Sequence, residues 1–121
     1  MPIRSLTGLL ACVSLCALAA DAPEKPFSLT IVRGAVPAEQ RTLRVEKGDA
    51  VRLRVTSDSP GELHLHGYRL AMRLEPSRPA ELTFAAYATG RYPFEWHGAG
   101  ATAAPRTHHA SPIATLEVRP K

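Results

Sequence analysis

Cysteine is nearly absent from this chain: its 121 residues include two, Cys12 and Cys16, both close to the N-terminus. Methionine is as scarce, and Met72 is the only one after the initiator. Thiolate and thioether sulfurs are the soft ligands that select Cu(I), and a thiolate is also needed for a disulfide or a cysteine nucleophile. If both cysteines are removed with a leader, the mature chain has no sulfur chemistry beyond one thioether.

The N-terminal stretch has the features of a secretory signal peptide. Arg4 provides a positive start, an apolar run follows from Leu6 to Leu18, and a small-x-small cleavage pattern ends it. The run is shorter than the roughly 20 apolar residues of a transmembrane helix, so we expect no membrane span after processing. We predict a signal peptide at 1–20 and a single domain at 21–121 that is periplasmic or secreted. Lipidation of Cys12 is the alternative.

Charge of one sign is not concentrated anywhere in the chain. Lysine and arginine number 15 against 11 acidic residues, for a formal net charge of +4. The arginines alternate with apolar residues and are interleaved with acids, which is typical of solvated strand faces. They show no basic stripe, and an exported chain does not meet nucleic acid, so we exclude nucleic acid as a partner. The arginines in question are Arg41, Arg44, Arg52, Arg54, Arg69 and Arg73.

Helical periodicity is missing, and alternation takes its place. Apolar residues recur at every second position in short runs that are separated by turns rich in glycine, proline, serine and aspartate. Regular strands and turns over about 100 residues predict an all-β fold, an antiparallel Greek-key β-sandwich of seven or eight strands. The expected strands cover 27–31, 43–45, 51–55, 63–67, 68–74, 80–84, 90–96 and 114–118.

Histidine is the chemically informative residue. His64 and His66 belong to the segment Leu63-His64-Leu65-His66-Gly67-Tyr68, and the period of a strand points both imidazoles to one face. Two neutral imidazoles on one face can form half of a metal site. Imidazole suits copper, zinc, nickel and iron, so the pattern favours a transition metal without identifying it.

The other three histidines follow further along the chain. His97 comes directly after an alternating aromatic run that we expect to face the core. The pair His108-His109 lies in residues 98–112, a long segment without a strand pattern. Such a loop is usually functional or mobile, and a connection whose histidines bind nothing is the alternative interpretation.

The order of these elements resembles the cupredoxin-like family. Residues 42–58, with a Lys-Gly-Asp turn at 47–49, resemble its opening strand pair, 90–96 its penultimate strand and 114–118 its closing strand. The resemblance covers most of the mature chain. It implies a small exported cupredoxin-like domain of the His-x-His-Gly-Tyr type.

The blue-copper ligands of that family are incomplete in this sequence. The family's cysteine falls at Trp96, and the methionine of the final loop is missing, so the resemblance implies no blue copper centre. His64, or alternatively His66, matches the family's first histidine. Short His-Leu-His-Gly and Trp-His-Gly fragments echo multicopper oxidases, but the rest of their copper signature is absent, so oxidase activity does not carry over. The loop that carries the family's remaining ligands corresponds here to the segment with His97, His108 and His109.

We therefore predict a periplasmic protein that binds copper for metal handling or delivery. Cu(II) is favoured and zinc competes. The partners would be the metal ion and an envelope metal-transport or redox protein. We expect the site at the end of the sandwich where strand 63–67 and loop 98–112 converge. Its predicted ligands are His64, His66, His97, His108 and His109, which Glu62 or Glu95 could complete.

The alternative is a metal-free sandwich that serves as an interaction or accessory module of an envelope transport system. In that case His64 and His66 would be polar strand residues facing water, and His97 would only hydrogen-bond a neighbouring strand. An enzyme is not expected, because the sequence contains no complete catalytic constellation.

Overall fold

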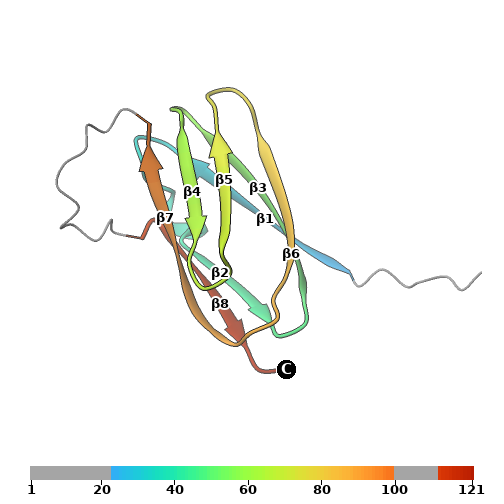
Figure 1. Ribbon diagram of the computed structural model, residues 1–121. Coiled ribbons are helices and arrows are strands. Elements are labelled where there is room, and N and C mark those ends of the chain that lie inside the picture. Colours follow the sequence, from blue (N-terminus) through green and yellow to red (C-terminus); the bar gives the residue numbers. More distant parts are fainter. Residues whose placement is uncertain (1–22, 100–111) are drawn as a thin grey trace, which may run out of the picture.

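The computed structural model describes residues 23–99 and 112–121, which form eight strands in two sheets packed face to face (Figure 1). The predicted signal peptide and the pair His108-His109 lie outside these residues. In the part of the chain that is described, no helix has the length and apolar character needed to cross a membrane.

The smaller sheet has three strands and the larger has five. The smaller sheet, in spatial order, consists of β1 (Glu24–Ile31), β3 (Ala50–Ser57) and β6 (Ala80–Ala85). The larger sheet, in spatial order, consists of β2 (Thr42–Glu46), β8 (Ala114–Arg119), β7 (Gly90–Gly98), β4 (Gly61–Leu65) and β5 (Leu70–Leu74). A short 3-10 helix, η1 (Ala38–Gln40), precedes β2.

The predicted β-sandwich is confirmed, and its sheets are mixed. Two neighbouring pairs, β1 with β3 and β2 with β8, are parallel, while the other four pairs are antiparallel. The chain crosses from one sheet to the other between most consecutive strands, and such a crossing can return a strand beside an earlier one in the same direction. Alternation predicts which residues form strands, but it does not reveal these pairings.

The core lies between the two inner faces and is built by the alternating residues. Val51, Leu53 and Val55 of β3 are fully buried, as are Leu63 of β4 and Phe94 of β7. Burying each such side chain contributes about 1.5–3 kcal/mol relative to leaving it exposed.

The outer face of the smaller sheet is charged, as the sequence predicts. Arg52 lies 3.1 Å from a carboxylate oxygen of Glu81, and Arg54 lies 3.6 Å from the other oxygen. These arginines are about half exposed, so they are solvated ion pairs and not a binding stripe.

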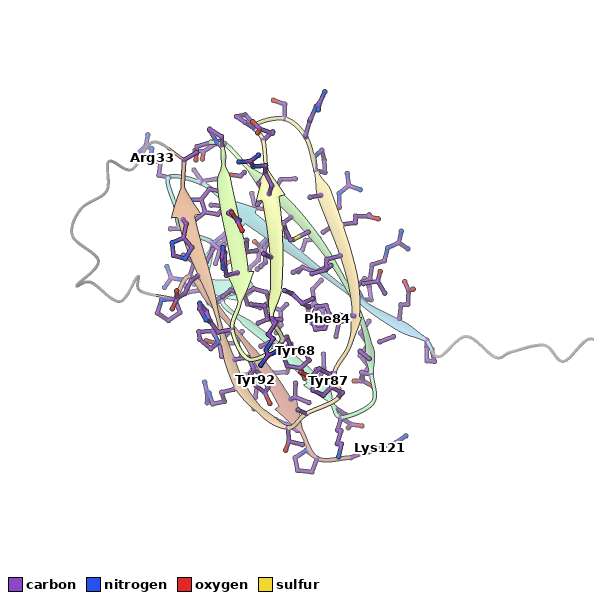
Figure 2. The ribbon with its side chains drawn as sticks, in the orientation of Figure 1. Arg33, Tyr68, Phe84, Tyr87, Tyr92 and Lys121 are labelled. Atoms are coloured by element: carbon purple, nitrogen blue, oxygen red, sulfur yellow. The ribbon has the colours of Figure 1, made fainter. Side chains whose placement is uncertain are left out.

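Aromatic side chains hold one end of the sandwich together (Figure 2). The Tyr68 ring packs against Phe84, Tyr87 and Tyr92 at centroid distances of 4.6–5.6 Å. Its hydroxyl donates to the carbonyl of Ala88 at 3.0 Å, and burial raises its pKa. The cluster ties the β4–β5 turn to the β6–β7 connection and thereby fixes β4 beside β7.

Candidate metal centre

Strands β4 and β7 are antiparallel neighbours, and their register brings four of the chemically informative residues face to face. Glu62 pairs with His97, and His64 pairs with Glu95. The strand period puts these four on the outer face of the larger sheet. The chain continues with His66, whose backbone N–H still donates to β7, so its imidazole joins the same face.

The inner faces of the same strands are closed to a metal. Leu63 and Phe94 are buried, and the Trp96 indole packs against Gly61 so closely that a Cβ there would lie 2.4 Å from a ring carbon. Trp96 is the residue at the expected position of the blue-copper cysteine. Because an indole has no lone pair to donate to a metal, the available ligands lie on the outer face.

One carboxylate oxygen lies at the centre of a cluster on this outer face, which consists of Glu62, His64, His66, Glu95 and His97. Oε2 of Glu95 lies 2.9 Å from Nε2 of His66 and 3.7 Å from Nε2 of His97. The third imidazole makes a separate contact, because Nε2 of His64 lies 3.0 Å from Oε1 of Glu62. Each imidazole therefore presents Nε2, the nitrogen farther from the backbone, to a carboxylate.

Two of the distances between the imidazole rings are compatible with ligands of one ion. An imidazole nitrogen about 2.0–2.1 Å from a metal puts the ring centroid about 3.2 Å from it, so two rings on one ion lie about 4.5–6.4 Å apart. The centroid of His64 lies 4.8 Å from that of His97 and 6.3 Å from that of His66. Both distances fall within this range, and the donor set of imidazoles and carboxylates fits copper or zinc.

The imidazole nitrogens and carboxylate oxygens of the cluster do not converge on one point. Over residues 23–99 and 112–121, the described conformation holds no group of three His, Cys, Asp or Glu side chains placed to bind one metal ion. In this conformation His64 contacts Glu62, while the other two imidazoles contact Glu95. These histidine side chains are 37–50% exposed, which leaves them room to turn about χ1 and χ2.

The structure thus brings together three of the five predicted histidine ligands, His64, His66 and His97. They lie on the face of the sheet, not at its end. Because β4 and β7 are antiparallel, Gly61 and not His66 pairs with Gly98, where the loop segment begins. His108 and His109 lie outside the described residues.

Sequence reasoning named Glu95 only as an optional ligand and missed its central place. The signal was present in the alternation of β7, where aromatic residues face inward, so Glu95 and His97 must share the outward face. The register of β7 against β4 could not be predicted from the sequence, because it depends on which strands become neighbours.

No protein-family model and no curated protein matches this sequence. Solved structures do match. A chain of a heme-copper terminal oxidase dimer superposes with a TM-score of 0.64 at 15% identity, covering 84% of this chain and 68% of that one. A copper binding protein in its apo form has a TM-score of 0.57 at 9% identity, covering 79% and 88%. The blue copper oxidase of Nitrosomonas europaea has a TM-score of 0.56 at 18% identity, covering 82% and 40%.

These likenesses confirm the fold predicted from the sequence, a cupredoxin-like β-sandwich. The identities are too low to carry over activity or ligands. The chain also spans less than half the length of the multicopper oxidases it matches.

Proposed function

We propose that this chain, which has the cupredoxin-like fold, is an exported copper-binding protein of the periplasm or cell exterior that handles or delivers the metal. The observation that carries the proposal is the cluster on β4 and β7, in which one Glu95 oxygen lies within 4 Å of two imidazole nitrogens. The similar structures include copper oxidases and a copper binding protein, which supports copper over zinc.

The donor set favours the oxidised metal. Imidazole nitrogen and carboxylate oxygen suit Cu(II), while Cu(I) prefers thiolate and thioether sulfur. The one mature methionine, Met72, is 8% exposed and belongs to the inner face of β5. Bound Cu(II) would supply a Lewis-acidic ion on an open face. His64, His66 and His97 would hold it, Glu95 would complete the set or orient the imidazoles, and His108 and His109 are proposed as additional ligands.

A binding role is favoured over a catalytic one because the face is open to water. The histidine side chains are 37–50% exposed, and among residues 23–99 and 112–121 no group at the cluster would exclude water from a reaction. An exposed ion can be exchanged directly with the ligands of another protein, which suits delivery to an envelope metal-transport or redox protein.

The test is a Cu(II) titration of the purified protein in a competing chelator, followed by electron paramagnetic resonance. We expect one bound equivalent with nitrogen couplings, lost in His64→Ala/His66→Ala. The variant His108→Ala/His109→Ala removes the same number of imidazoles and reports whether that pair contributes. Unchanged affinity in His64→Ala/His66→Ala would refute the site, and no Cu(II) binding would leave a sandwich that works through protein contacts.

A further inference from the structure

A hollow of about 260 Å³ borders the outer face of the larger sheet, where the proposed metal centre lies. It is found where β4 begins and β5 and β7 end. Its walls include two members of the cluster, Glu62 and His97. They also include Arg73 and Glu75, which lie at the end of β5 and just beyond it. A molecule in this hollow would therefore touch the edge of the proposed metal centre.

The sheet register lines up the polar side chains of the hollow. Arg73 pairs with Glu62 and Glu62 pairs with His97, so the three form one row across β5, β4 and β7. Glu62, the middle residue of the row, contacts its own strand neighbour His64, with its Oε1 lying 3.0 Å from Nε2 of the imidazole. In residues 23–99 and 112–121, Arg73 makes no ion pair, so its guanidinium is available to a ligand.

The charge of the hollow depends on the metal. Without metal, the positive charge of Arg73 is outweighed by Glu62 and Glu75, and an anion is repelled. A divalent ion on the neighbouring histidines and Glu95 cancels this negative charge, so the anion is no longer repelled, and the ion offers an open coordination position. The guanidinium fork also matches a carboxylate geometrically.

We propose that the hollow holds a small carboxylate that binds together with the metal. One carboxylate oxygen coordinates the ion beside His97, and the other accepts hydrogen bonds from Arg73. This inference rests on the proposed function, since it needs the ion. The protein would then take up or pass on copper as a complex with a small carboxylate.

The experiment uses acetate as the probe and the purified protein loaded with one equivalent of Cu(II). Acetate binding is followed by the change in the electron paramagnetic resonance spectrum, and Cu(II) affinity without acetate is measured separately for every variant. We expect saturable acetate binding that needs the metal. Because the contact is exposed, Arg73→Ala should weaken it about fivefold, and Arg73→Lys should weaken it less.

The matched control is Arg91→Ala, which removes an arginine from the far end of β7, away from the hollow. It should leave acetate binding unchanged. Normal Cu(II) binding with no acetate effect would overturn this inference alone, as would equal weakening by Arg73→Ala and Arg91→Ala. Absence of Cu(II) binding would overturn the inference together with the proposed function.

Discussion

At the scale of single residues, Glu95 lies at the centre of the proposed metal site. Its side chain is 23% exposed, less than any of the three histidines, and one of its oxygens contacts two imidazoles. In the proposed copper site, this carboxylate would either bind the ion or fix the orientation of the imidazoles that do.

Glu95→Gln should weaken Cu(II) binding by about tenfold to a hundredfold, the usual effect of removing a partner that orients metal ligands. Glu117→Gln is the control, because Glu117 lies on the same sheet face, on β8, and its ion pairs in the described part of the chain are all with arginines. Competition titration of both variants measures the effect. Equal affinities for Glu95→Gln and the unmodified protein would remove Glu95 from the site.

Gly61 is required by the close approach of Trp96. A Cβ at Gly61 would lie 2.4 Å from an indole carbon and 2.7 Å from the carbonyl oxygen of His97. We expect Gly61→Ala to lower the free energy of unfolding by about 1–3 kcal/mol, measured in urea. Gly98→Ala is the control beside the same indole, since a Cβ there would lie 3.7 Å from the nearest indole atom. Equal losses in the two variants would contradict the proposed clash.

At the scale of elements, the turn between β2 and β3 is held by Asp49. Its carboxylate accepts the backbone N–H of Glu46 at 2.8 Å and lies 3.0 Å from Nζ of Lys25 on β1. The backbone hydrogen bond, followed by the lysine, lowers the pKa of Asp49 below its ordinary 3.8. A lowered carboxyl pKa stabilises the fold above the unfolded pKa, and this contribution is lost as the pH falls through the folded value.

Asp49→Asn should therefore reduce the acid sensitivity of the fold. In the unmodified protein, part of the stability disappears as the pH falls from about 5 toward 2, and the variant lacks this part. Urea unfolding at pH 7 and at pH 3 measures it: the difference between the two proteins should be larger at pH 7. A difference that does not change with pH would show that Asp49 acts only through turn geometry.

The elements of this fold were largely predictable and their pairing was not. Period-2 alternation identified the strands and the shared face of His64 and His66, because side-chain direction is a local property. The parallel pairs β1–β3 and β2–β8 and the Glu62–His97 register depend on contacts between distant segments. The expected site at the end of the sandwich followed the family pattern, whereas the antiparallel register of β4 and β7 puts the three described histidines on the sheet face.

At the scale of the whole molecule, the cupredoxin-like sandwich carries the cluster on the outer face of its larger sheet. The core lies between the sheets, and Trp96 closes the interior near β4. The proposed metal chemistry is therefore displaced to the surface of the larger sheet, where a partner protein can reach it.

Metal binding should stabilise the whole domain, since an ion held by β4 and β7 binds the folded chain in preference to the unfolded one. At a free Cu(II) concentration of about 100 times Kd, the free energy of unfolding should rise by about 2.7 kcal/mol. Chemical unfolding with and without the metal measures this, with His64→Ala/His66→Ala as the control that should gain little. An equal gain in that variant would mean that copper stabilises the fold from another place.

The most direct test of a copper site on β4 and β7 is a two-dimensional amide NMR spectrum recorded while substoichiometric Cu(II) is added. A paramagnetic ion broadens the signals of nuclei near it. We predict that the amide signals of His64, His66, Glu95 and His97 disappear first, while those of β1 and β3 in the other sheet persist. Early loss on β1 and β3, or no selective loss at all, would contradict a copper site on the outer face of β4 and β7.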